Sequence, residues 1–328
     1  MRYWVQLATE QFPPSELVEQ AVEAERAGFD ALNVSDHFQP WWEPGHSGQA
    51  WLLLGAIGRA TERLEVGTGV TAPVHRYHPA VVAQFGATLQ ELFPGRGFLG
   101  IGSGESLNES PAGMDWPDTG EQVRRMEEAL EIIDRLLDGE RLDHDGPFFR
   151  AKRAYLHTRG NERPPIYVSA FGPDAAGVAA RFGDGLWTLA DPESAPDLIE
   201  VYRRECEAAE KEPGEIILQT GFSWARDDDE ALEGARVWKA TQPEEYFTDD
   251  WHDPKRMYEK AEAEVSDEEF KESYIIGSDP ELHVARIREV EELGATIVCL
   301  QNGSGADPLG ALRTYGEHVL PALKGAAV

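Results

Sequence analysis

Short apolar and β-branched runs alternate with amphipathic helical patterns along the whole chain. The runs predict strands near residues 3–8, 30–35, 64–71, 97–102, 165–170, 185–189, 215–223 and 295–301. This alternation is typical of repeated strand–helix units that build a parallel sheet. Eight strands fit a closed barrel, so we predict an α/β fold of the (β/α)8 TIM-barrel class.

Start and stop signals define three of the helices between these strands. A Pro-Pro-Ser stretch at 13–15 begins one helix that Gly28 ends, His78-Pro79 begins a second, and residues 119–121 lead into a long helix through Leu137. Two segments depart from the alternation. Residues 139–164 predict a hairpin before strand five, because a turn signal at 145–147 separates two short β-like runs.

The second departure is an insertion at 241–279, between strands seven and eight, which contains a very acidic helix. Insertions on the C-terminal side of a barrel commonly cover the active site. We therefore expect residues 1–328 to form a single barrel domain, with this insertion as a lid.

The charge of the chain is unusual. It has 60 acidic and 30 basic residues, a net charge of −30, and only 7 of the basic residues are Lys. Such a charge argues against nucleic acid as a partner. The acidic residues are spread over the helix faces, which resembles proteins of salt-in halophiles, where salt screens the self-repulsion. A halophilic source is our hypothesis, and an ordinary acidic mesophilic protein is the alternative.

Two other features limit the possible function. No apolar run is long enough to span a membrane, and the N-terminus lacks the pattern of a signal peptide, so we expect a cytoplasmic protein without membrane contact. Cys206 falls in a predicted helix and Cys299 in a predicted strand, without metal-ligand spacing. We therefore predict buried thiols, with no disulfide framework and no metal site.

Candidate chemistry lies where strands end, because barrel enzymes place catalysis at the C-terminal ends of their strands. Polar and glycine-rich segments follow strands two to five, at 35–42, 67–71, 102–108 and 169–173. His37 is able to accept a proton near neutral pH and stands beside Asp36. Glu105 lies in a glycine-rich strand end, where burial would raise its pKa enough to keep a proton available. The alternatives are a structural histidine and a carboxylate that faces a helix dipole.

At these residues the chain resembles the coenzyme F420-dependent glucose-6-phosphate dehydrogenase family, within the bacterial-luciferase-like superfamily of flavin- and deazaflavin-dependent oxidoreductases. The matching segments are Ala-Thr-Glu-Gln-Phe at 8–12, Ser-Asp-His-Phe-Gln-Pro-Trp at 35–41, Arg-Tyr-His-Pro-Ala at 76–80 and Gly-Ser-Gly-Glu-Ser-Leu-Asn-Glu at 102–109. The similarity covers nearly the whole chain and is weakest from about 189 to 273.

The resemblance implies roles for individual residues. His37 would remove the substrate hydroxyl proton as hydride leaves for C5 of the deazaflavin, Glu105 would protonate the reduced ring, and Trp41 would line the substrate pocket, with Glu10 facing the same mouth. The residues implied to bind the cofactor, coenzyme F420, are Asp36, Gly69, Val70, Gly104, Asn108, Ala170, Phe171 and Gly172. The family has a non-proline cis peptide at the place of Gly69-Val70, and Gly172-Pro173 begins a helix whose free N–H groups suit a phosphate. Phe171 replaces the first of two family glycines there.

The family pattern fails at the substrate phosphate. Its three cations align with Asp191, Glu259 and Ser273, and Lys260 is one place out of register. We therefore expect an unphosphorylated alcohol or sugar as substrate instead of glucose 6-phosphate. A flavin mononucleotide (FMN) monooxygenase and a non-catalytic flavin-binding barrel are the alternatives, and we also expect a homodimer.

Overall fold

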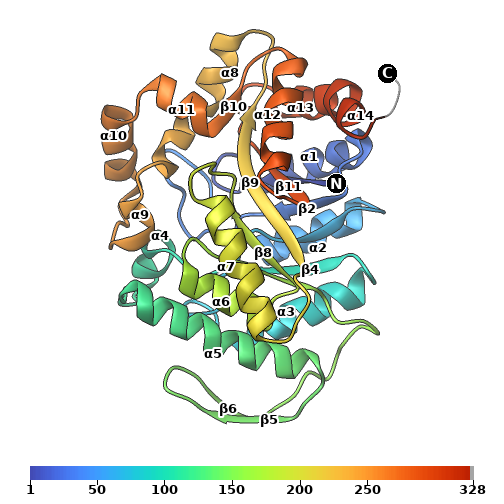
Figure 1. Cartoon of the computed structure of the whole chain (residues 1–328), viewed down its shortest axis with the longest axis vertical. Coiled ribbons are helices and arrows are strands. Elements are labelled where there is room, and N and C mark those ends of the chain that lie inside the picture. The colour runs from blue at the N-terminus through green and yellow to red at the C-terminus, as the bar shows by residue number, and fades with distance from the viewer. Residues whose placement is uncertain (326–328) are drawn as a thin grey trace.

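The parallel strands of the protein close into a barrel with helices around it (Figure 1), in a computed structural model that describes residues 1–325. In sheet order the barrel strands are β1 (Arg2–Leu7), β2 (Ala31–Val34), β3 (Glu65–Thr68), β4 (Gly97–Ile101), β7 (Ile166–Ser169), β8 (Gly185–Leu189), β9 (Glu215–Ser223) and β11 (Ile297–Asn302). Pairing of β11 with β1 closes the ring. The prediction of eight barrel strands and a TIM-barrel fold is therefore confirmed. The last three positions of the predicted domain, 326–328, lie outside the described residues.

The helices of the outer ring begin and end where the sequence signals place them. Helix α1 (Pro14–Ala27) ends at Gly28, whose φ of 93° is in the left-handed region that favours glycine. The N-cap of α3 (Pro79–Leu92) is His78, and that of α5 (Thr119–Leu137) is Asp118. The other outer helices are α2 (Ala50–Ala60), α6 (Pro173–Phe182), α7 (Ala195–Ala208), α8 (Asp228–Ala235), α12 (Pro280–Glu292), α13 (Pro308–Thr314) and α14 (Leu320–Leu323), with η2 (Arg236–Thr241) after α8 and η3 (Tyr315–Val319) before α14.

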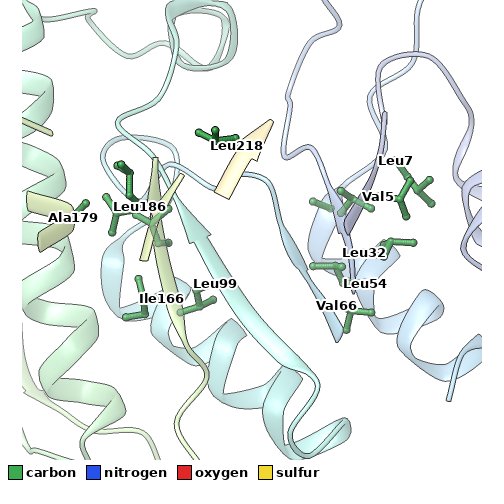
Figure 2. Close-up of a cluster of buried hydrophobic side chains, with 14 of the residues drawn as sticks. Val5, Leu7, Leu32, Leu54, Val66, Leu99, Ile166, Ala179, Leu186 and Leu218 are labelled. Atoms are coloured by element: carbon green, nitrogen blue, oxygen red, sulfur yellow. The ribbon is translucent and has the colours of Figure 1, made fainter. Parts of the chain in front are cut away.

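One face of each barrel strand packs outward against the helices. Figure 2 shows this layer, in which side chains such as Val5 and Leu32 from the strands meet Leu54 of α2. The opposite strand face fills the barrel in two layers. An apolar layer contains Trp4, Phe98, Tyr167 and Trp187. A polar layer of Gln6, Asn33, Gln219 and Gln301 follows toward the C-terminal ends of the strands and forms the floor of the barrel mouth.

Both segments that depart from the alternation have the predicted locations. The hairpin pairs β5 (Leu142–Asp145) with β6 (Arg150–Ala154), outside the barrel and beside α5 (Figure 1). The insertion lies between β9 and β11 and contains α9 (Glu245–Thr248), α10 (Pro254–Glu264), α11 (Asp267–Ser273) and a short strand, β10 (Tyr274–Ile276). Strand β10 pairs in parallel with the C-terminal end of β9 and was not predicted.

Hydrogen bonds connect the insertion to two loops at the barrel mouth. Ser106, after β4, donates to the carbonyls of Asp249 and Trp251 at 3.1 and 2.7 Å. The side-chain amide of Gln39, after β2, donates to the carbonyl of His252 at 3.1 Å. The insertion therefore packs against the loops that carry His37 and Glu105. No helix among the described residues has the length and apolar character that crossing a membrane requires.

Candidate active site

Three titratable side chains from three strand ends meet at the mouth of the barrel. His37 Nε2 lies 3.5 Å from Glu10 Oε1 and 3.4 Å from Glu105 Oε2. Glu10 follows β1, His37 follows β2 and Glu105 follows β4. The Glu10 and His37 side chains keep only 2% and 11% of their exposure, and Glu105 keeps 23%. The structure thus places His37 and Glu105, the two residues predicted to transfer protons, beside Glu10, which was predicted to face the same mouth.

His37 Nδ1 has two polar neighbours. It lies 3.2 Å from the carbonyl oxygen of Gln39, which can only accept, and 3.4 Å from Asn108 Nδ2, which can only donate. The shorter contact favours the tautomer in which Nδ1 carries the proton. The lone pair of Nε2 therefore points between the two carboxylates.

Glu105 and Asn108 lie on the same side of α4 (Ser106–Glu109), which the 3₁₀ turn η1 (Ser110–Ala112) continues. Asn108 Nδ2 donates to Glu105 Oε2 at 3.1 Å, and Asn108 Oδ1 accepts from the backbone N–H of Phe38 at 2.7 Å. Burial raises the pKa of Glu105, and nearby Glu10 adds to the increase, while His37 opposes it. The Glu105 carboxylate makes no capping hydrogen bond to the backbone of α4, so it remains available to groups at the barrel mouth.

Asp36 lies in a buried network behind His37. Its carboxylate accepts from Thr71 Oγ1 at 2.7 Å and from the Tyr77 hydroxyl at 3.2 Å, and Arg76 donates to its carbonyl at 2.8 Å. Arg76 also contacts Glu109, which is fully buried and whose pKa burial raises to about 6. Only 4% of Asp36 is exposed, so little of its surface is available to a cofactor. Its role in cofactor binding remains a prediction.

Sequence reasoning assigned no role to Arg76 and Glu109, although both lie in quoted motifs. The signal was present in the spacing, because Glu109 is four residues after Glu105 and so shares its side of the helical turn. Together the two residues connect the loop after β3 to α4.

The predicted cofactor segments line the mouth at β3, β4 and β7. The peptide bond between Gly69 and Val70 is cis, as the resemblance implied. A Cβ at Gly69 would collide with the Asn33 side chain of the polar floor, and Gly104 has a φ of +89°, so both positions suit glycine. Gly172 is the N-cap of α6, with open space in front of it. Ala170, two residues earlier, is buried.

Aromatic side chains border the three titratable groups. The Trp41 ring is 5.6 Å from the His37 ring between centroids, and Trp41 is 3% exposed. Its neighbour Trp42 packs edge-on against Trp238, with 4.9 Å between the ring centroids. Phe171 is 57% exposed.

The three positions aligned with phosphate-binding cations, and Lys260 beside them, have partners within the protein. Glu259 lies 3.9 Å from Lys255 Nζ. Asp191 accepts hydrogen bonds from Ser194 and from the backbone N–H of Glu193 within its own turn. Ser273 donates to Gln242 Oε1 at 2.7 Å. Lys260 forms ion pairs with Glu245, at 3.1 Å, and with Glu264. Each of these side chains is therefore engaged within the protein.

The fold and the site define a class: an α/β-barrel enzyme with titratable side chains that converge at the C-terminal ends of the strands. The chain belongs to the luciferase-like monooxygenase family, whose model matches residues 1–296.

Several known proteins are similar over almost the full length. The F420-dependent glucose-6-phosphate dehydrogenase of Microbacterium testaceum (strain StLB037) is 37% identical, over 99% of this chain and 98% of its own. The F420-dependent hydroxymycolic acid dehydrogenase of Mycobacterium tuberculosis (strain ATCC 25618 / H37Rv) is 36% identical, over 98% and 88%. The structure of an F420-dependent secondary alcohol dehydrogenase in complex with an F420-acetone adduct superimposes with a TM-score of 0.94 at 32% identity, over 98% of both chains.

Proposed function

We propose that the protein is a coenzyme F420-dependent dehydrogenase that transfers a hydride between the CH–OH carbon of an alcohol or sugar and C5 of the deazaflavin. The observation that carries the proposal is the placement of His37 Nε2 between Glu10 and Glu105 at the barrel mouth. The relatives that act with F420 support it, because they match the chain over nearly its whole length.

The residues of the mouth fit such a cofactor. The side-chain oxygens of Gln6 and Asn33 are buried in the floor without a hydrogen-bond partner among the described residues, so they can accept from the polar edge of a bound ring. Gly172 leaves the first N–H groups of α6 accessible, and α6 has ten residues, so its N-terminus suits a phosphate. We assign the ring to the floor beside Gly69 and Val70, and the phosphate to Gly172.

In this proposal the residues of the chain manage the protons. When bound, F420 supplies the hydride acceptor for the substrate C–H bond. His37 Nε2 takes the hydroxyl proton as the carbonyl forms, and the resulting imidazolium is stabilised by the carboxylate of Glu10. Glu105, with its raised pKa, holds a proton at the mouth, and Asn108 orients its carboxyl group. Trp41 beside His37 keeps water away from this proton transfer.

A cofactor titration tests the proposal. We expect the purified protein to quench the fluorescence of F420 on binding and to reduce it with an alcohol without consuming oxygen. FMN, titrated in parallel, is the control. Tight FMN binding with oxygen uptake on turnover would assign the protein to the monooxygenases instead, and binding without any turnover would favour a non-catalytic barrel.

We also propose a homodimer that forms through α2 and α3. The chain has a net charge of −30, but the outer face of these two helices is nearly free of charge. Its exposed charged side chains are one acidic residue, Glu91, and one basic residue, Arg59. Large apolar side chains are exposed on it, with Leu52 at 79%, Leu92 at 59% and Val81 at 38%. Contact with a second copy would remove this apolar surface from water.

Leu52→Lys should dissociate the homodimer, because it places two charges in a desolvated interface. Sedimentation in concentrated salt measures the mass, with Leu282→Lys on α12 as the control at a position of 40% exposure. A wild-type protein that sediments as a monomer contradicts the homodimer, and a Leu52→Lys variant that remains dimeric contradicts the proposed interface.

A further inference from the structure

A continuous row of aromatic rings leads away from His37. Trp41 lies next to His37, the Phe247 ring is 5.4 Å from Trp41 between centroids, and the Phe171 ring is 5.8 Å from Phe247. Trp41 follows β2, Phe247 belongs to α9 of the insertion and Phe171 follows β7. Three segments that are distant in sequence therefore build one apolar wall.

The wall becomes more exposed with distance from His37. Trp41 is 3% exposed, Phe247 is half-buried and Phe171 is 57% exposed. Phe38, directly after His37, is 50% exposed. Large apolar side chains that gather beside a catalytic group and keep this much surface are typical of a binding wall, because a ligand covers them during use.

The charges around the wall disfavour an anionic substrate. At its inner end, beside His37, lie the carboxylates of Glu10 and Glu105. Lys260, on α10 of the insertion, is held by Glu245 and Glu264. A phosphate on the substrate would therefore lose its hydration at this wall beside two carboxylates.

We propose that the substrate is an alcohol with an apolar arm, whose carbinol group lies at His37 and whose arm extends along Trp41, Phe247 and Phe171. This inference rests on the proposed function and specifies its substrate class. Phe247 and Phe171 are the residues that determine the specificity, and the insertion supplies one of them.

Binding measurements on dead-end complexes test the substrate class without hydride transfer. The holoenzyme with reduced F420 is titrated by calorimetry with linear 2-alkanols of increasing length, and with glucose 6-phosphate. We expect the Kd of the alcohols to fall roughly fourfold for each added CH2 group, the factor that burial of one CH2 group gives. We expect glucose 6-phosphate to bind more weakly than the longer alcohols.

Two variants and a control locate the arm. Phe247→Ala and Phe171→Gly should reduce the dependence of Kd on chain length for the CH2 groups that lie along the replaced ring. Phe182→Ala is the matched control, because Phe182 is half-buried at the end of α6, before the first residue of β8 and thus at the opposite end of the barrel. Its dependence on chain length should equal that of the wild type.

The outcomes separate this inference from the proposed function. A Kd independent of chain length, or tighter binding of glucose 6-phosphate, overturns the apolar arm even if F420 is reduced by other alcohols. A normal dependence on chain length without any turnover overturns the dehydrogenase and leaves the apolar wall intact. If Phe171→Gly weakens F420 binding and leaves the alcohol series unchanged, Phe171 belongs to the cofactor site and not to the arm.

Discussion

Replacement of His37 by Ala should lower kcat by roughly two to four orders of magnitude, the usual contribution of a general base. The variant removes the nitrogen lone pair that lies between Glu10 and Glu105, and neither carboxylate has the position of Nε2. F420 affinity should remain near that of the wild type, because the floor and the N-terminus of α6 are unchanged. Steady-state kinetics with a saturating alcohol and fluorescence quenching measure the two quantities.

Two controls make this test specific. His318→Ala removes a histidine that is 55% exposed on η3 and should leave kcat unchanged. Imidazole added to the buffer should restore part of the activity of His37→Ala, because it supplies the missing ring to the vacated space. A His37→Ala variant that turns over at the wild-type rate would remove His37 from the mechanism.

Dilution of salt from about 1 M to below about 0.1 M should reduce activity roughly tenfold or more and lower the melting temperature. The Debye length grows over this range from about 3 to about 10 Å, so carboxylates that salt had screened begin to repel one another. The net charge is −30, and runs of acidic residues begin α8 at Asp228–Glu230 and α11 at Asp267–Glu269.

Salt also weakens attractive ion pairs, and this effect opposes the gain from screened repulsion. Most pairs here lie at the surface, like those of Arg236 with Glu233, Glu262 and Asp267, and such pairs contribute about 0–1 kcal/mol each. Acidic residues outnumber basic ones two to one, so repulsion dominates. Sucrose at equal osmolality is the control, because it does not screen charge. Full activity and an unchanged melting temperature in dilute buffer would reject a halophilic adaptation.

The sequence predicted the barrel because its strands are buried on both faces and appear as apolar runs between amphipathic helices. It predicted the cluster of Glu10, His37 and Glu105 because strand ends converge in a barrel. Strand β10 escaped prediction because it has three residues and pairs with the end of β9, a contact that local pattern does not encode. The meeting of Phe171 with Phe247 escaped for the same reason, since the insertion had no predicted position relative to strand five.

The buried network of Asp36 shows another limit of sequence reasoning. A residue next to a catalytic base is expected at the mouth, but Thr71, Arg76 and Tyr77 draw Asp36 inward. These three residues are 35 to 41 positions further along the chain. They reach Asp36 because they follow β3, which pairs in parallel with β2.

The two layers inside the barrel bear on how enzymes of this kind diverge. Trp4 packs against Phe98, Tyr167 and Trp187, and this aromatic layer supports the polar floor from below, where Trp187 Nε1 donates to Gln219 Oε1 at 2.9 Å. Loops and insertions at the C-terminal side of the polar floor can therefore change while the aromatic layer stays as it is. Mutations in these loops should alter the ligand that is bound and leave the free energy of folding largely unchanged. Changes in the loops around the barrel mouth would thus allow one scaffold to serve relatives named for substrates as different as a sugar phosphate and a hydroxymycolic acid.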